Sequence, residues 1–247
     1  MFIPFGFYKS PEEAASYVTD GLVAYFDAND ASSYPGSGTT WTDLSGNGYD
    51  ATATSSPSYT AASPSYFDFD ETYQFKVTNS TAAQTTNGSH TWMAAVNVDT
   101  WANFQGILGT TDGGSVVAGT SRIKAQTNSS QNRFAIQTWD SATNAVNSWA
   151  AESFSTATWY IIAGTMDWSS PYGMETFVNN VSKGTGTQSS NVPSGALDTI
   201  HIGDVTNALD ADAYDGKLGF VMIYNKVLNG TELTQNYDYF KATYGLS

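Results

Sequence analysis

The stretch "GLVAYFDAND" at residues 21–30 predicts a β-strand that is buried on both faces. Side chains alternate along an extended chain, so Leu22 and Phe26 would lie on one side and Val23 and Tyr25 on the other. Both sides of the segment are therefore apolar, which is typical of a buried strand.

Ten further short strand-like runs follow, and Gly, Asn, Ser and Pro separate nearly all of them. Short strands at regular spacing, with turn residues between them, predict an all-β fold of two antiparallel sheets, a sandwich or jelly roll. No boundary between domains is evident. The runs are SYFDFD (65–70), YQFKVT (73–78), HTWMAAVNV (90–98), FQGILGT (104–110), SRIKAQT (121–127), RFAIQTW (133–139), TWYIIAGTM (158–166), METFVNN (174–180), DTIHIGDV (198–205) and GKLGFVMIYN (216–225).

One helix is expected near the C-terminal end, at about residues 231–242. Asn229 can cap its first turn, and Glu232, three residues later, completes the spacing of a capping box. Apolar residues then recur at intervals of three and four from Leu233 to Tyr244, which gives the helix one apolar stripe to lay on the sandwich.

The composition excludes several classes of function. Nine basic and 23 acidic residues give a net charge of -14, which argues against a nucleic-acid partner, because such binding depends on neutralising phosphates. The absence of cysteine excludes disulfides, a thiolate nucleophile and Cys-ligated metals. We expect no membrane partner, because no apolar run approaches the roughly 18 residues of a membrane span.

The stretch "YPGSGTTWTDLSGNGYDA" at residues 34–51 combines four glycines with one tryptophan. It could be a phosphate-binding loop, a metal or catalytic loop, or a structural corner of the β-fold. The phosphate loop is disfavoured, because the lysine of the GxxxxGK[ST] motif is missing. We favour the structural corner, with Trp41 packed inward, since Gly accepts positive φ and Asn and Asp side chains cap turns.

Four segments, taken in order, resemble the laminin-G-like, concanavalin A-like jelly-roll domains of bacterial and phage surface proteins. The resemblance implies a two-sheet antiparallel β-sandwich with one short C-terminal helix. The resemblance begins at residue 21, so we assign residues 21–247 to a jelly-roll domain and residues 1–20, from their own apolar pattern, to an N-terminal docking arm. The segments are residues 21–30, 34–51, 65–70 and 216–240.

The residues do not favour catalysis. Glycoside hydrolysis needs two carboxylates about 5 to 10 Å apart, and none of the glutamates forms the ExDxE or ExDxxE strand motif that hydrolytic relatives of this fold carry. A Ser–His–Asp system would need a base, but His90 and His201 lie in strand-like runs and no GxSxG motif accompanies them. We expect no enzymatic activity, and a glycan hydrolase ranks third among the functions considered.

The resemblance makes Ca²⁺ the main candidate cofactor, because laminin-G-like domains often bind it through carboxylate and carbonyl oxygens. The acidic residues fall near the first loops and in "GDVTNALDADAYDG", and neither group has the spacing of an EF-hand loop. A solvated acidic loop would give the same pattern. The candidate ligands are Asp27, Asp43, Asp204, Asp210, Asp212 and Asp215.

Several aromatic side chains could offer stacking surfaces to sugar rings. Most aromatic residues of a β-sandwich belong to its core, so only a minority is expected to have this role. The candidates for carbohydrate binding are Trp101, Trp139, Trp149, Trp168 and Tyr172.

The apolar N-terminal arm predicts docking onto a partner, since exposed apolar patches mark interaction surfaces. Together with the resemblance, it predicts a non-enzymatic phage virion structural protein, a capsid decoration or cement protein on the virion surface. The expected partners are the major capsid protein and further copies of the chain. The alternative is a carbohydrate-binding tail-fibre or baseplate adhesin that binds a cell-surface glycan. The docking residues would be Phe2, Ile3, Phe5, Phe7 and Tyr8.

Overall fold

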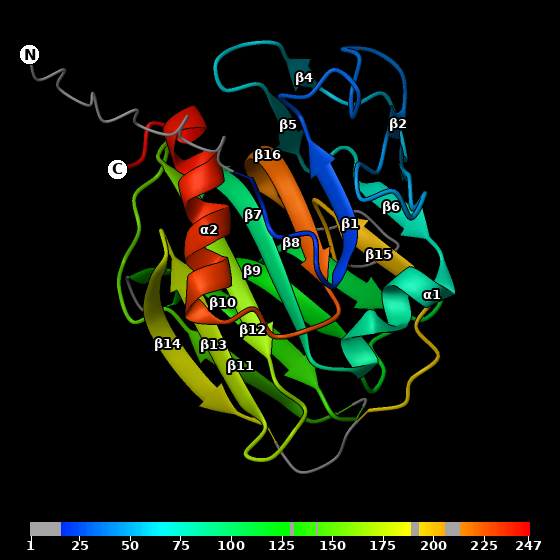
Figure 1. Ribbon diagram of the computed structural model, residues 1–247, viewed down its shortest axis with the longest axis vertical. Helices are drawn as coiled ribbons and strands as arrows, with labels where there is room; N and C mark the ends of the chain where they lie inside the picture. Colours follow the sequence, from blue (N-terminus) through cyan, green and yellow to red (C-terminus); the bar gives the residue numbers. More distant parts are fainter. Residues whose placement is uncertain (1–15, 129–130, 142, 189–192, 206–212) are drawn as a thin grey trace, which may run out of the picture.

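A computed structural model describes residues 16–128, 131–141, 143–188, 193–205 and 213–247. Within them the strands form two antiparallel sheets of eight strands each, packed face to face, with an 11-residue helix on the outside (Figure 1). This architecture confirms the predicted all-β sandwich with one short C-terminal helix.

The order of the strands defines the two sheets. Sheet A runs β14 (Val181–Thr187), β13 (Gly173–Val178), β12 (Trp159–Met166), β7 (His90–Val98), β16 (Asp215–Tyr224), β5 (Tyr66–Asp70) and β4 (Tyr59–Thr60), and β1 (Leu22–Asp27) also pairs with β16. Sheet B runs β11 (Ala145–Trp149), β10 (Gln131–Trp139), β9 (Ser121–Asn128), β8 (Gln105–Thr111), β15 (Thr199–Ile202), β6 (Phe75–Thr78), β3 (Ala51–Ala53) and β2 (Thr40–Trp41). The helices are α1 (Ser80–Ala83) and α2 (Gly230–Phe240), with 3₁₀ turns at Gln84–Asn87 and Lys241–Tyr244.

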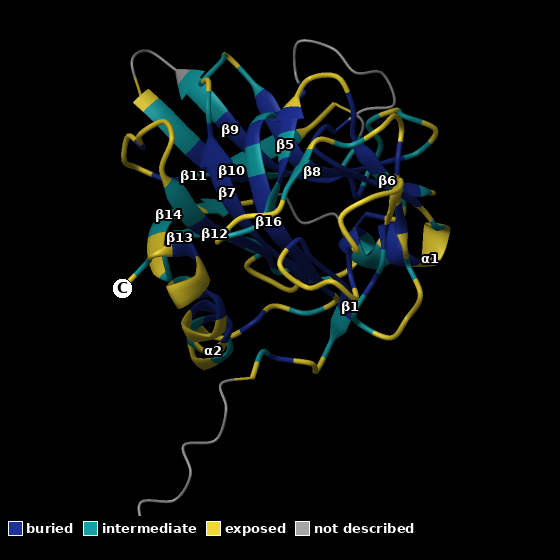
Figure 2. Cartoon of the chain, turned by 90° about the horizontal axis from the view of Figure 1, so that it is seen from above, coloured by how far each residue is buried: buried dark blue, intermediate teal, exposed yellow. Residues whose placement is uncertain are grey.

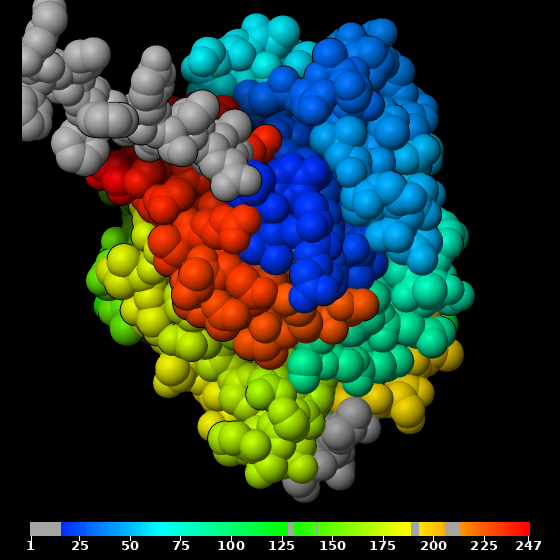
Figure 3. Space-filling view, in the orientation of Figure 1, coloured from blue at the N-terminus to red at the C-terminus, as the bar shows by residue number. Residues whose placement is uncertain are grey.

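The first and last strands of the described chain are neighbours. Phe26 of β1 lies opposite Val221 of β16 in an antiparallel pair. In the space-filling view the blue surface of the first strand therefore lies directly beside the orange and red surface of the C-terminal segment (Figure 3). Both faces of β1 are buried except at Leu22, as its apolar alternation predicted.

Trp41 lies at the centre of an aromatic cluster between the sheets. Its side chain is fully buried, and its ring centre lies 4.6 Å from that of Phe67, 5.3 Å from Phe75 and 5.4 Å from Phe26. Tilted rings at such distances add about 0.5 to 1.5 kcal/mol per pair to the free energy of burial. The prediction that Trp41 packs inward is confirmed.

The loop after Trp41 is fastened to β1 by the side chain of Asp43. The Asp43 carboxylate accepts hydrogen bonds from the backbone N–H groups of Tyr25, Ser45 and Tyr49 at 2.9 to 3.0 Å, and from the Ser45 hydroxyl at 2.7 Å. Gly46 supplies a backbone φ of +87° in the turn, which favours glycine. The loop is therefore a structural corner.

Helix α2 covers the outer face of sheet A. It begins at Asn229, whose side chain accepts from the backbone of Thr231 and Glu232, while Glu232 accepts from the backbone of Asn229 to complete the capping box. One side of the helix is buried against the strands and the other is exposed (Figure 2). In the described residues no helix is long and apolar enough to cross a membrane.

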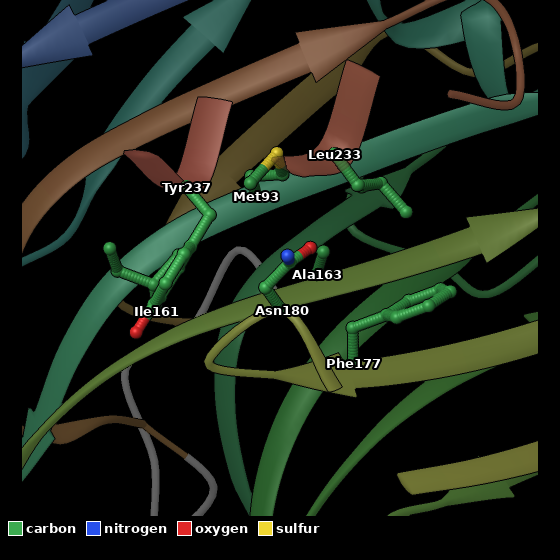
Figure 4. Close-up of a pocket in the computed structure, with 7 residues that line it drawn as sticks. All are labelled: Met93, Ile161, Ala163, Phe177, Asn180, Leu233 and Tyr237. Atoms are coloured by element: carbon green, nitrogen blue, oxygen red, sulfur yellow. The ribbon is translucent and has the colours of Figure 1, made fainter. Parts of the chain in front are cut away.

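The contact between α2 and sheet A leaves little empty space. A cavity of about 10 Å³ lies under the helix, and Figure 4 shows that Leu233 and Tyr237 of the helix line it together with Met93 and Ile161 of the strands, with Tyr237 directed toward Ile161. That volume can hold about one water molecule, so it is too small for a ligand. This face of the sandwich is therefore closed beneath the helix.

A buried polar network joins the first described residues to α2. The side-chain oxygen of Asn236 accepts from the backbone N–H of Val18 at 2.8 Å, and its amide nitrogen donates to the Tyr224 hydroxyl at 3.0 Å. Tyr224 in turn donates to the carbonyl oxygen of Val18 at 2.9 Å. Val18 belongs to the stretch that the sequence assigned to the docking arm, and here it packs on the sandwich.

Gly184 and Gly186 of β14 allow the two sheets to approach closely at one edge of the sandwich. The backbone N–H of Ala151 donates to the carbonyl of Lys183 at 2.7 Å, and Ser148 of β11 donates through its hydroxyl to the carbonyl of Gly184 at 2.8 Å. A Cβ atom on Gly184 would lie 1.8 Å from the carbonyl oxygen of Trp149. Only glycine fits at this contact.

We predict that Gly184→Ala lowers the free energy of unfolding by at least about 3 kcal/mol, because two backbones must separate to admit the methyl group. Gly173→Ala is the control, since a Cβ there meets nothing within 4 Å, and we expect it to change stability by less than about 1 kcal/mol. Urea unfolding followed by tryptophan fluorescence measures both. Equal stability of the two variants would contradict the close contact.

Candidate functional site

The outer face of sheet B carries charged side chains, whereas α2 covers the apolar middle of the outer face of sheet A. In β9, Ile123 and Ala125 belong to the core between the sheets. Since side chains alternate along a strand, Arg122 and Lys124 lie on the opposite, outer face. A pocket of about 280 Å³ lined by Thr165, Glu175 and Thr185 lies beside the helix on sheet A, so both outer faces offer polar surface.

Trp149 of β11 reaches across β10 to Lys124. In the cross-strand register, Trp149 lies opposite Ala135 of β10, and Ala135 lies opposite Lys124 of β9. Because Ala135 is small, the Trp149 ring extends over it, and the Lys124 ammonium lies 4.5 Å from the ring centre. The guanidinium of Arg133 lies 4.8 Å from the same ring centre.

The alternation of cations and rings continues toward the other end of β9. Lys124 also lies 5.1 Å from the ring centre of Phe104, and the Arg122 guanidinium lies 5.8 Å from it. The Trp139 ring centre is 4.7 Å from the Arg122 guanidinium. All these distances fall within the range of cation–π attraction. We call this row of side chains the cation–aromatic ladder; its members are Trp139, Arg122, Phe104, Lys124, Trp149 and Arg133.

The segment after β15 covers the part of this face over β8. Gly106 and Gly109 of β8 are packed by Val205, and a Cβ atom on Gly106 would lie 2.3 Å from a methyl carbon of Val205. Gly203 donates through its backbone N–H to the carbonyl of Ile107 at 2.8 Å, which fixes where the segment crosses the sheet. The accessible part of the outer face therefore lies over β10 and β11.

The accessible part combines a cation, a ring and two amides. Arg133, Gln137, Asn147 and Trp149 are half-buried, and Gln137 lies directly opposite Asn147. The Arg133 Nε, Gln137 Oε1 and Asn147 Oδ1 atoms have no hydrogen-bond partner among the described residues. These three atoms are buried, so a ligand can meet only the half-exposed remainder of the cation, the ring and the amides.

His201 lies on the same face in a directional hydrogen-bond chain. The Gln74 amide nitrogen donates to the Asp204 carboxylate at 3.3 Å, so the Gln74 oxygen accepts from His201 Nδ1 at 2.7 Å. His201 Nε2 then accepts from the Thr111 hydroxyl at 2.8 Å. Burial, together with the charges of Lys76 and Arg122, lowers the pKa of His201 from its usual 6.5 to about 3. His201 is a neutral structural residue and no base.

The predicted sugar-stacking residues lie in several different environments. Trp139 and Trp149 belong to the cation–aromatic ladder. Trp101 packs on the core residue Phe134 with ring centres 5.1 Å apart, so it lies at the end of the core between the sheets. Trp168 is buried and donates to the carbonyl of Thr86 at 3.2 Å, and Tyr172 packs beside it in a separate cluster. The five aromatic residues therefore share no single surface.

The candidate calcium ligands are also dispersed. Asp27 accepts from Asn29 and from the Tyr25 hydroxyl, and burial raises its pKa above the usual range. Asp43 fastens the structural corner, and Asp204 is fully buried beside Gln74. Asp215 begins β16 opposite Asp70. Asp210 and Asp212 lie outside the described residues, and among the rest no three acidic or histidine side chains form a metal-binding group. Calcium binding stays a prediction.

The predicted docking residues, Phe2, Ile3, Phe5, Phe7 and Tyr8, lie outside the described residues. The described part of the predicted arm contacts its own sandwich. Tyr17 packs against Tyr25 and Tyr239 with ring centres 4.9 and 5.3 Å apart, and Val18 joins the buried network with Asn236.

The chain belongs to the concanavalin A-like lectin/glucanases superfamily, whose laminin G family model matches residues 69–234. This match confirms the resemblance that the sequence segments indicated. Comparison with curated protein sequences gives no match.

Solved structures with the same fold include domain 4 of AbnA, a GH43 extracellular arabinanase from Geobacillus stearothermophilus, in complex with arabinotriose. It is 14% identical with a TM-score of 0.64, and the match covers 87% of this chain and 98% of that one. A Trypanosoma rangeli sialidase in complex with sialic acid is 16% identical with a TM-score of 0.63, over 90% of this chain and 33% of that one. The binding domain of botulinum neurotoxin DC in complex with SialylT is 13% identical with a TM-score of 0.65, over 89% of this chain and 52% of that one. This chain thus spans a third of the sialidase and half of the neurotoxin domain, and the likeness concerns the fold.

The cations of the ladder were not among the predicted site residues, although the sequence contains a signal for them. In "SRIKAQT" and "RFAIQTW", basic residues alternate with core residues, and these two runs hold both arginines of the chain. Two adjacent strands that each present a basic residue on the face away from the core predict a basic patch. The partnership with Trp149 depends on the register between strands, which the sequence does not show.

We predict that the fold loses stability as the pH falls below about 6.5. Burial lowers the pKa of His90 to about 4 and that of His201 to about 3, so each histidine binds a proton only after unfolding over this range. The contribution of each neutral histidine to the free energy of unfolding is complete above the unfolded-state pKa of about 6.5 and is lost as the pH falls toward the folded-state pKa. Between pH 7 and pH 5 the loss is about 2 kcal/mol per histidine.

Urea unfolding of the protein and of His201→Gln at pH 7 and pH 5 measures this effect. The variant should lose about 2 kcal/mol less than the parent between the two pH values, because the carboxylates are the same in both proteins. An equal loss in both would show that His201 titrates normally in the folded protein.

Proposed function

We propose that this chain is a non-enzymatic carbohydrate-binding module that uses the outer face of sheet B. The observation that carries the proposal is the cation–aromatic ladder, which places N–H donors and half-buried amides on a rigid sheet surface. Binding sites for polar ligands commonly combine apolar walls with a few fixed polar groups, and this surface has that composition.

The family supports a ligand of this class. The AbnA domain, which the match covers almost completely, is in complex with arabinotriose, and the neurotoxin domain is in complex with SialylT. A shared fold does not by itself transfer a ligand, so the residues of sheet B remain the main support. Placement on a phage particle, with a capsid protein as partner, rests on the sequence resemblance and stays a prediction.

We predict that the protein binds at least one oligosaccharide on an array of neutral and acidic glycans, and that Trp149→Ala weakens this binding at least tenfold. The variant removes the ring that supports both Lys124 and Arg133, and tenfold corresponds to about 1.4 kcal/mol. Tyr239→Ala is the control, because Tyr239 is an exposed aromatic residue of α2, on the covered face of sheet A.

Circular dichroism and thermal unfolding would establish that Trp149→Ala is folded, and Arg133→Ala provides a second variant of the same surface. Retention of wild-type affinity in both ladder variants would exclude this face as the binding site. Failure of the wild-type protein to bind any glycan would contradict the proposed function.

We also predict no release of reducing sugar from the glycans that bind. A hydrolase needs its two carboxylates about 5 to 10 Å apart. Glu71 follows β5 and Glu175 lies in β13, and four strand spacings across sheet A separate these strands by about 19 Å. Reducing-sugar release that disappears in Glu71→Gln or Glu175→Gln would overturn the non-enzymatic assignment.

A further inference from the structure

The pocket of about 280 Å³ on sheet A contains a row of polar side chains that a ligand can reach. Thr165 of β12 lies directly opposite Glu175 of β13, and Glu175 lies directly opposite Thr185 of β14. Neighbouring strands are about 4.8 Å apart, so a hydroxyl, a carboxylate and a second hydroxyl follow one another across about 10 Å of the sheet. Glu175 is half-buried and Thr185 is exposed.

This row lies on the outer face of the sheet. Ala163 and Phe177 belong to the apolar cluster under α2, and they are two positions away from Thr165 and Glu175 along the same strands. Side chains two positions apart in a strand share a face, so Thr165 and Glu175 point outward as well. The pocket therefore continues the outer face of sheet A where the helix no longer covers it.

The hollow exists because position 173 has no side chain. Gly173 lies two positions before Glu175 in β13 and lines the same pocket. A Cβ atom on Gly173 would meet no atom within 4 Å, and the residue does not have a positive φ. A larger residue can therefore be placed here without backbone strain, and its side chain would fill the pocket.

Thr165 is nearly buried, yet its hydroxyl has no hydrogen-bond partner among the described residues. The residue retains 5% of its exposure and borders the pocket. The hydroxyl of Thr91, its neighbour on β7, is fully used, since it donates to the carbonyl of Lys226 and accepts from the N–H of Leu228, both at 2.9 Å. An unpaired hydroxyl of low exposure is costly, so the Thr165 hydroxyl favours a polar group in the pocket.

Two carboxylates make the pocket negative, and the ion pairs among the described residues join lysines to other carboxylates. Glu175 accepts from the Ser182 hydroxyl at one oxygen, which leaves its second oxygen open. Asp167 uses one oxygen to accept from the Ser89 hydroxyl at 3.0 Å and from Ser169. Partial burial opposes the ionisation of Asp167, but the hydrogen bonds from Ser169 and Ser89 outweigh it and lower its pKa.

From this arrangement we infer that the pocket binds the protonated amine of an amino sugar. An ammonium group has three N–H donors and no acceptor, and the Glu175 carboxylate and the hydroxyl oxygens of Thr165 and Thr185 can accept from it. Sugar hydroxyl groups beside the amine can donate to Asp167. Val227, which is exposed and lines the pocket, offers an apolar contact to the C–H groups of the sugar ring.

The inference goes beyond the proposed function, which concerns sheet B, and it does not depend on it. Lysine and arginine side chains carry no acceptor, so the cations of the ladder cannot accept from an ammonium group. An acetylated amine has lost the charge that strengthens a hydrogen bond to a carboxylate. The pocket should therefore distinguish a free amine from an acetylated one.

Titration calorimetry on the full chain at pH 6 tests the inference with three probes. Chitotriose carries free, protonated amines, triacetylchitotriose has the same sugar backbone without the charge, and spermidine has three amines but no hydroxyl groups. We expect chitotriose to bind at least tenfold more tightly than either of the other two. Equal affinity for the acetylated sugar would show that the amine is not recognised. Equal affinity for spermidine would show a general attraction of cations, and either result would overturn the inference.

Two variants with the same change in net charge locate the site. Glu175→Gln should weaken chitotriose binding at least tenfold. Glu71→Gln is the matched control, because Glu71 is exposed and follows β5, about 19 Å across the sheet from β13, and it should change the affinity less than twofold. Equal losses in the two variants would indicate attraction by the net charge of the chain and would overturn the inference.

Two further variants test the pocket without changing its charge. Gly173→Leu should fill the hollow and weaken chitotriose binding at least tenfold, and thermal unfolding would establish that the variant is folded. Thr165→Val replaces the unpaired hydroxyl by a methyl group of the same shape and should weaken binding several-fold. Wild-type affinity in both variants would exclude the pocket.

The inference and the proposed function fail separately. Loss of chitotriose binding in Trp149→Ala but not in Glu175→Gln would assign this ligand to sheet B and overturn the inference. If chitotriose does not bind while other glycans of the array bind through Trp149, the inference is wrong and the proposed function stands. Chitotriose binding that depends on Glu175, without any binding through the ladder, would support the pocket and contradict the site on sheet B.

Discussion

The packing of α2 on sheet A buries the apolar middle of one outer face of the sandwich. Strands β7 and β16 bury apolar side chains on both faces, so the outer face of sheet A would expose a large apolar area without a cover. The stripe of Leu233, Tyr237 and Phe240 provides that cover, and the ring of Phe240 stacks on Phe220 at 3.9 Å. Hydrophobic burial therefore closes the middle of this face, while Thr165 and Glu175 line an open pocket beside the helix.

The cation–aromatic ladder reduces the free-energy cost of burying like charges on the outer face of sheet B. Arg122, Lys124 and Arg133 are close enough to repel one another, and Arg122 and Lys124 are largely removed from water. The negative faces of Trp139, Phe104 and Trp149 offset part of this cost, at about 0.5 to 2 kcal/mol for each contact. The strands fix the spacing, so the charges are held in position before any ligand arrives and little side-chain freedom remains to be lost on binding.

The parts of the fold that follow from local pattern were predictable from the sequence. Alternation identified β1 and β7, and the Asn229 and Glu232 pair placed the start of α2 within one or two residues. The edge strand β14 was not anticipated, because "VSKGTGT" lacks apolar alternation and is held by a backbone contact with β11. The site was less predictable than the fold, since Trp149 meets Lys124 only through the register of three strands and the small size of Ala135.

The pairing of β1 with β16 and the network of Val18, Asn236 and Tyr224 have a consequence for the order of folding. Val18 and Asn236 are separated by 218 positions, and β1 finds its strand partner only after β16 has been synthesised. Until then an apolar strand with both faces exposed must remain unpaired, and such strands are prone to associate with other chains. Contacts of this range also slow folding, because the entropy of closing a long loop is lost before the strands gain their pairing. The first strand of the sandwich is thus fixed only when its last strand is in place.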